Sequence, residues 1–116
     1  MRKAGQIALF KFPQTDFFNG KLRPALLIAK LPGDYEDWLV CMISSQVHQY
    51  IKDVDDIISP DSDDFLQSGL KTQSVFRVSR LAVAAEGIII GTIGTISQER
   101  LNRIKNNLIT WIKSSA

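Results

Sequence analysis

The chain contains few of the residues that mark metal, disulfide or membrane proteins. It has one cysteine and one histidine in 116 residues, so no internal disulfide can form and the usual ligands of a zinc site are too few. No apolar run approaches the roughly 18 residues of a membrane span. The apolar segment after the basic start is broken by Lys11 and Pro13, unlike a secretion signal. We therefore expect one domain over residues 1–116, in the cytoplasm, with no membrane partner.

The single cysteine and the single histidine have unremarkable surroundings. Cys41 lies inside the apolar run Trp38-Leu39-Val40-Cys41-Met42-Ile43, which is typical of a small buried core residue and not of a reactive nucleophile. His48 has no second histidine or cysteine at ligand spacing, so we expect it to be a surface or packing residue.

Acidic residues are concentrated in one stretch. Six of the twelve lie between residues 53 and 64, at Asp53, Asp55, Asp56, Asp61, Asp63 and Asp64. Their spacing lacks the glycine turn and the distal glutamate of a calcium loop, and Ser59-Pro60-Asp61-Ser62 is strong turn chemistry. The sequence predicts a solvated acidic loop, no metal site and no cofactor.

Outside that stretch, positive charge is in excess. All 14 Lys and Arg residues lie there, against the six acidic residues that remain. Such a balance favours a polyanion such as a nucleic acid as a partner. A merely solvated basic surface is the alternative, because the sequence does not show whether these residues share one face.

Apolar runs separated by turn signals predict a strand-rich chain that ends in a helix. The predicted strands are residues 6–12, 24–30, 38–43, 74–78 and 87–93. Several short strands of this kind indicate a mainly β fold, a small barrel or sandwich, against which the final helix packs. Phe10, Trp38 and Ile90 fit either the core or a two-fold interface.

The final helix is predicted to begin after Ser97, a suitable N-cap residue. Its apolar positions, spaced by three and four, are Leu101, Ile104, Leu108, Trp111 and Ile112. Arg100, Arg103 and Lys105 lie mainly away from that stripe, so we expect them to be solvated.

The most informative segment is Lys21-Leu22-Arg23-Pro24-Ala25-Leu26-Leu27-Ile28-Ala29-Lys30, in which basic residues and a proline precede an apolar run. A proline at this position is compatible with the start of a strand or with an edge strand. Arg23 is therefore expected at the mouth of a strand, where its planar fork of donors suits a phosphate. An ordinary surface arginine is the alternative interpretation.

Several short segments occur along nearly the whole chain in a characteristic order. They are Gly5-Gln6-Ile7, Phe12-Pro13-Gln14-Thr15-Asp16, Lys21-Leu22-Arg23-Pro24-Ala25-Leu26, Ile43-Ser44-Ser45-Gln46, Ser74-Val75-Phe76-Arg77-Val78-Ser79-Arg80-Leu81 and Ile93-Gly94-Thr95-Ile96. Together they resemble the MazF/PemK-like toxins of bacterial type II toxin–antitoxin systems, and the Arg-Pro-Ala signature is the most specific piece. The resemblance implies a small SH3-like barrel, shared with the CcdB gyrase poisons, that forms a homodimer.

Members of that family are typically metal-independent endoribonucleases that cut single-stranded RNA at short sequences. A cognate antitoxin neutralises them, and toxin and antitoxin bind DNA together. By position, Arg23 matches the family's catalytic arginine, and Ser44 matches a position where many members have a catalytic threonine. Serine keeps the hydroxyl that can donate to a phosphate oxygen, and Ser45 is an alternative hydroxyl. Where some relatives have a glutamate, this chain has Phe17, Phe18 and Asn19, so no general base is evident.

The resemblance also implies a surface that binds RNA around the loop of residues 14–21. The expected contacts are Thr15, Phe17, Phe18, Lys21, Gln46, Lys71, Arg77 and Arg80. Phenylalanine rings stack on unpaired bases, and lysine and arginine meet phosphates. The alternatives are core or dimer contacts for the two phenylalanines, and antitoxin capture or solvent-facing strand positions for Lys71, Arg77 and Arg80.

Two other classes of function remain open. A poison of the same fold would bind a protein target such as DNA gyrase, without cutting RNA, and would depend on the final helix and Trp111. An inactive barrel would bind RNA or a peptide only. Arg23 together with a hydroxyl at residue 44 favours the endoribonuclease.

Overall fold

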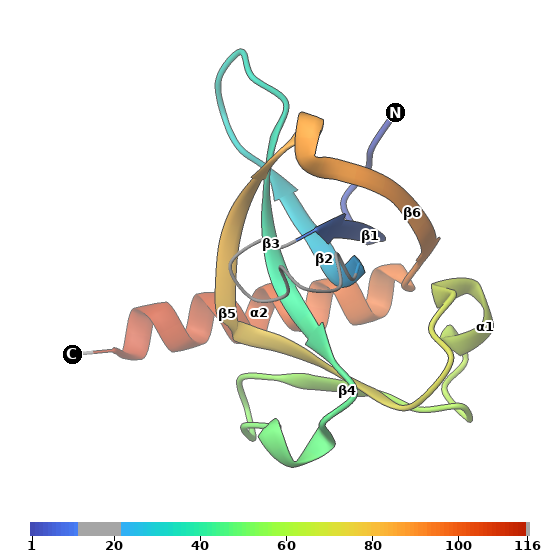
Figure 1. The fold of residues 1–116 in the computed structure, drawn as a ribbon. Coiled ribbons are helices and arrows are strands. Elements are labelled where there is room, and N and C mark those ends of the chain that lie inside the picture. Colours follow the sequence, from blue (N-terminus) through green and yellow to red (C-terminus); the bar gives the residue numbers. More distant parts are fainter. Residues whose placement is uncertain (12–21, 116) are drawn as a thin grey trace.

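The computed structural model describes residues 1–11 and 22–115. Its strands are β1 (Gln6–Lys11), β2 (Leu22–Lys30), β3 (Asp37–Ser44), β4 (Asp56–Ile58), β5 (Ser74–Ala85) and β6 (Ile89–Thr95). Its helices are α1 (Phe65–Ser68), α2 (Gln98–Ser114) and the short 3₁₀ turns η1 (Val47–Gln49) and η2 (Glu86–Ile88). The expectation of a mainly β fold with a C-terminal helix is confirmed (Figure 1).

The strands form one antiparallel sheet in the order β4-β5-β3-β2-β1-β6. The sheet curls strongly (Figure 1), yet its edge strands β4 and β6 do not pair with each other in the described part of the chain. Instead α1 packs against β6, so closely that a Cβ atom at Gly94 would overlap the backbone carbonyl groups of Gln67 and Ser68. A helical turn, and not a strand pair, therefore bridges the two edges.

Buried side chains form two clusters on opposite faces of the sheet. Along β2, Leu26 and Ile28 belong to one cluster while Ala25 and Leu27 belong to the other, as the alternation of a strand requires. A strand that is buried on both faces has a continuous apolar sequence, which explains why this run was recognisable. Cys41 is fully buried in the first cluster, as predicted. Burial and the charge of Asp55 raise the pKa of its thiol, which keeps it unreactive.

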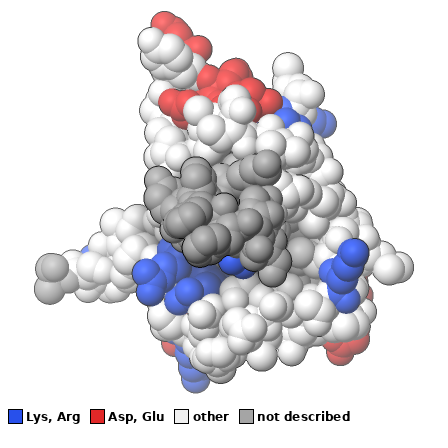
Figure 2. All heavy atoms as spheres, viewed as in Figure 1, with Lys and Arg blue, Asp and Glu red and all other residues white. Residues whose placement is uncertain are grey.

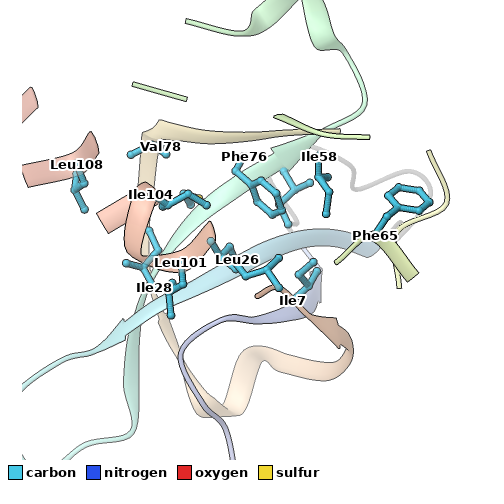
Figure 3. Close-up of a cluster of buried hydrophobic side chains, with 13 residues drawn as sticks. Ile7, Leu26, Ile28, Ile58, Phe65, Phe76, Val78, Leu101, Ile104 and Leu108 are labelled. Carbon is cyan, nitrogen blue, oxygen red and sulfur yellow. The ribbon is translucent and has the colours of Figure 1, made fainter. Parts of the chain in front are cut away.

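The helix α2 covers the first cluster with Leu101, Ile104 and Leu108 (Figure 3). Its start is as predicted, because the Ser97 hydroxyl oxygen accepts a hydrogen bond of 3.1 Å from the backbone N–H of Arg100. The prediction that Ile112 is buried is wrong: it is 58% exposed, since the last turns of α2 extend beyond the sheet (Figure 1). Within the described residues, no helix has the length and apolar character needed to cross a bilayer.

The predicted solvation of the acidic stretch and of the α2 arginines is wrong for the residues that matter most. Asp55, Asp56, Asp64 and Arg100 are all at most 8% exposed. Arg100 donates from Nε to Asp64 at 2.8 Å, from Nη2 to the second Asp64 oxygen at 3.0 Å and from Nη1 to Asp56 at 2.6 Å. Arg103 donates to Asp56 at 2.8 Å. This arginine–aspartate network, Asp56, Asp64, Arg100 and Arg103, fixes α2 to β4 and to the residue before α1.

The network changes the protonation of its members. Burial alone would raise the pKa of the Asp64 carboxyl, but hydrogen bonds from Arg100 and from the Ser97 N–H outweigh it and hold the pKa at about 2. The pKa of Arg100 is raised, because Asp64 and Asp56 outweigh the opposing effect of burial. Both groups are therefore charged at neutral pH.

The strand β5 is longer than predicted and is bent by a bulge. Its pairing with β3 sets Met42 opposite Arg77 but Cys41 opposite Leu81, so residues 78–80 have no partner on β3. Asp55 stabilises this bulge, because one of its oxygens accepts from the Ser79 N–H at 3.4 Å. The bend carries β5 around the curled sheet.

Candidate functional site

A groove of about 820 Å³ opens where β2 begins and β3 ends. Its lining comes from the start of β2, the end of β3, the turn into η1, the residues before β5 and the start of β5 itself. Five of the predicted site residues line it, namely Arg23, Ser44, Gln46, Lys71 and Arg77. Arg80 is exposed in the β5 bulge and is not part of the lining. Thr15, Phe17, Phe18 and Lys21 lie outside the described residues.

The pairing of β2 with β3 brings the two predicted catalytic residues together. Ala25 lies opposite Met42; along each strand, Arg23 lies two residues from Ala25 and Ser44 two residues from Met42, so each shares the face of its neighbour. Residues opposite each other in an antiparallel pair point to the same face of the sheet. Arg23 and Ser44 therefore face the same side of the sheet at the groove end.

Ser44 ends β3 and has its hydroxyl oriented by the next turn. The Ser44 oxygen accepts a hydrogen bond of 3.0 Å from the backbone N–H of Gln46, which leaves the hydroxyl hydrogen able to donate. Ser45 also lines the groove but is exposed. Of the two hydroxyls, Ser44 has the more constrained position.

Arg77 adds a guanidinium to the groove lining. It lies opposite Met42 on β3 and so on the same face as Arg23 and Ser44. Its Nε is buried and has no hydrogen-bond partner among the described residues. Because Arg77 lines the groove, its guanidinium adds a positive charge that suits an anion.

The charge of the groove has one sign. Arg23, Lys71 and Arg77 line it, and the described lining contains no carboxylate and no histidine. Figure 2 shows basic side chains next to the grey residues on one face, while acidic side chains gather at the top of the view. In the described ranges no group of three or more His, Cys, Asp or Glu side chains is arranged to hold a metal ion. The positively charged donors of Arg23, Lys71 and Arg77 suit phosphate oxygens.

A second hollow, of about 640 Å³, has mixed charge. Arg2 and Lys30 line it together with Glu36 and Glu86, and Arg2 donates from Nε to Glu86 at 3.1 Å. Because its cations are matched by carboxylates, it lacks the uniform positive charge of the groove at Arg23.

Comparison with known proteins identifies the family. The sequence matches the family of PemK-like, MazF-like toxins of type II toxin–antitoxin systems over residues 3–112. The chain belongs to this family. No curated protein sequence matches it significantly.

The fold of this PemK-like toxin is similar to solved structures. An endoribonuclease in complex with its cognate antitoxin, from a mycobacterial species, superposes with a TM-score of 0.67 at 10% identity, over 100% of this chain and 99% of the other. The Mycobacterium tuberculosis toxin MazF-mt6 superposes with a TM-score of 0.68 at 13% identity, over 96% of this chain and 99% of the other. At such identities the likeness shows the fold alone.

The groove of this PemK-like toxin also contains residues that sequence reasoning missed. Gln49 and Ser74 line it, although neither was a candidate. Gln49 follows the recognised Gln46 by three residues, the spacing of one 3₁₀ turn. That spacing was the available signal, but the turn η1 itself was not predicted.

Proposed function

We propose that this PemK-like toxin is a metal-independent endoribonuclease that cuts single-stranded messenger RNA at short sequences. The observation that carries the proposal is the groove, which Arg23, Ser44 and Arg77 line together without an opposing carboxylate in the described lining. A solved structure of the same fold is described as an endoribonuclease with its cognate antitoxin, which supports the same class of activity here.

RNA provides its own nucleophile, so the protein has to stabilise charge and fix geometry. In the proposed reaction the 2′ oxygen attacks phosphorus and the bond from phosphorus to the 5′ oxygen breaks. The products are a 2′,3′-cyclic phosphate and a 5′-hydroxyl. Arg23 stabilises the negative charge that develops on the phosphorane, and the Ser44 hydroxyl donates to a nonbridging oxygen. Arg77, which also lines the groove, binds a phosphate through its guanidinium.

The two proton transfers are assigned to solvent. The described lining holds neither a carboxylate nor an imidazole, and a guanidinium with a pKa above about 12 is a poor acid or base. In this proposal the 2′-OH loses its proton to water or hydroxide, and water protonates the leaving 5′ oxygen. Arg23 acts through its charge.

The proposal includes a cognate antitoxin, a homodimer and a place in the cytoplasm. Of the three residues that fit either a core or a two-fold interface, Phe10 and Trp38 are buried within the single chain. Ile90 is 60% exposed on β6, so it is the one of the three that is free to contact a second copy.

The deciding experiment is cleavage of a long single-stranded RNA in EDTA, with the new ends mapped by sequencing. We expect discrete cuts with cyclic-phosphate ends. Arg23→Ala should slow cleavage by about a hundredfold to a thousandfold, and Ser44→Ala by less, because each removes a donor to the developing charge. Arg80→Ala is the matched control, since this arginine lies outside the groove lining, and it should cut like the wild type.

Absence of cleavage by the folded protein, freed of any bound antitoxin, would overturn the proposal. An Arg23→Ala variant that stays toxic to cells would instead favour a poison acting on a protein target such as gyrase. Binding of RNA without cleavage would favour the inactive barrel.

A further inference from the structure

Two glutamine side chains line the same stretch of the groove. Gln46 precedes η1 and Gln49 ends it, and the backbone N–H of Gln49 donates to the Gln46 carbonyl oxygen at 2.9 Å. Gln46 is the N-cap of η1, and its backbone dihedral angles differ from those of a 3₁₀ turn. Both glutamines line the groove, and Gln49 is half-buried. No hydrogen bond joins either side-chain amide to another described residue.

These amides differ in chemistry from the rest of the groove. Arg23, Lys71 and Arg77 offer donors alone, which suits phosphates of any sequence. An amide offers one donor beside one acceptor, and a base edge offers the complementary pair, as adenine does at N6 and N7. In single-stranded RNA the base edges are free of pairing partners. Gln46 and Gln49 are the only side-chain amides in the described lining.

The two glutamines lie close in sequence to the residue that is proposed to bind the reacting phosphate. The backbone N–H of Gln46 donates to the Ser44 hydroxyl oxygen at 3.0 Å, so the amide pair begins two residues from the proposed catalytic hydroxyl. Arg23, Ser44 and the two glutamines line one groove, so a nucleotide whose phosphate lies at Arg23 and Ser44 has the glutamine amides in the same groove.

We infer that Gln49, together with Gln46, reads one base of the RNA beside the bond that is cut, through hydrogen bonds to a base edge that has a donor next to an acceptor. This inference rests on the proposed function of the groove and adds the source of its sequence preference. The turn itself depends on the Gln49 backbone, so replacing the side chain leaves the turn in place.

The test compares wild type, Gln49→Ala and Gln49→Glu by sequencing all cut sites in one long RNA. Gln49→Ala should still cut, but with the base requirement relaxed at one position and the rate at the original motif about tenfold to a hundredfold lower. Gln49→Glu, which only accepts, should shift the preference toward the bases that present an amino group (adenine, cytosine and guanine) and away from uracil, which has none. Gln67→Ala is the matched control, because Gln67 is exposed on α1 and outside the lining.

A Gln49→Ala variant with an unchanged motif would overturn the inference and leave the endoribonuclease proposal intact. Binding to the four RNA homopolymers is measured in parallel, so that the inference is tested even if the wild type cuts nothing. Loss of a preference for one homopolymer in Gln49→Ala would then support base reading by a barrel that only binds RNA. Equal affinities of wild type and variant for all four would overturn it.

Discussion

The guanidinium of Arg77 is held in a position that is unfavourable without a ligand. A buried donor that lacks a partner costs about 1–3 kcal/mol, and Arg77 Nε is buried and unpaired among the described residues. The cationic guanidinium lines the groove, so its place there suits the binding of an anion better than the stability of the free protein.

Salt dependence measures this role directly. Arg77→Met keeps the apolar stem of the side chain and removes the charge, so affinity for single-stranded RNA should fall to a similar degree for all sequences. A plot of the logarithm of affinity against the logarithm of salt concentration has a negative slope. Its magnitude should become smaller by about 0.7, the value for one phosphate contact on a single strand. Fluorescence anisotropy over a range of salt concentrations provides the measurement.

Arg80→Met provides the comparison, because Arg80 belongs to the same strand but lies in the bulge and outside the groove lining. We expect its salt slope to equal that of the wild type. If both variants lowered the slope equally, the two arginines would contribute only general surface charge, and the assignment of Arg77 would be wrong.

At the scale of elements, the contact between α1 and β6 replaces the missing pair of strands. The backbone approaches so closely at Gly94 that a side chain there would overlap the carbonyl groups of α1. Gly91, on the same strand, has open space where a Cβ atom would lie. The two glycines thus lie on the same strand, but only Gly94 is crowded by a neighbouring element.

We expect Gly94→Ala to lower the free energy of unfolding by about 1–3 kcal/mol or more, because overpacking forces the backbone to shift. Gly91→Ala should be within about 0.5 kcal/mol of the wild type, or slightly stabilising, since it restricts only the unfolded chain. Urea unfolding followed by circular dichroism measures both. Equal stability of the two variants would show that α1 does not rest on β6.

The elements that were predictable have a local signal. The apolar runs in β2 and β3 and the spacing of Leu101, Ile104 and Leu108 in α2 are visible in the sequence. The three helix residues are buried, as is the middle of each strand. β4 has three residues and begins with a buried aspartate, so no apolar run marks it. Its pairing with β5 depends on residues distant in the chain, as does the bulge that Asp55 stabilises.

At the candidate site and around it, too, some residues were recognisable from local sequence and others were not. Arg23 and Ser44 were recognisable from motifs, and the register of β2 with β3 agrees with their proximity. The Arg100–Asp64 pair joins residues 36 positions apart, and no local pattern announces such a partner. A charged residue on a helix is usually solvated. The prediction that Arg100 is solvated was wrong because the tertiary structure places Asp64 and Asp56 beside it.

At the scale of the whole molecule, the arginine–aspartate network makes stability depend on pH. The Asp64 pKa is lowered from 3.8 to about 2. A carboxyl with a lowered pKa contributes stability above its unfolded pKa, and this contribution is lost as pH falls through the folded pKa. The contribution of Asp64, about 2 kcal/mol, should therefore be complete above about pH 5 and disappear toward pH 2.

Urea unfolding of wild type and Asp64→Asn between pH 6 and pH 2 checks this expectation. The difference in unfolding free energy should be near 2 kcal/mol at pH 6 and should shrink as pH falls from about 4 to about 2. Asp63→Asn is the control, because Asp63 is exposed, and its curve should follow the wild type. A difference between wild type and Asp64→Asn that stays constant over this range would contradict the pairing of Asp64 with Arg100.

Most side chains of the groove belong to neither buried cluster. Arg23, Gln46, Gln49 and Thr72 line it, while the clusters that stabilise the sheet are formed by other residues. Substitutions at Gln46, Gln49 and Thr72 remove no side chain from either core. During evolution, a scaffold built in this way is able to change the lining of its groove without loss of folding.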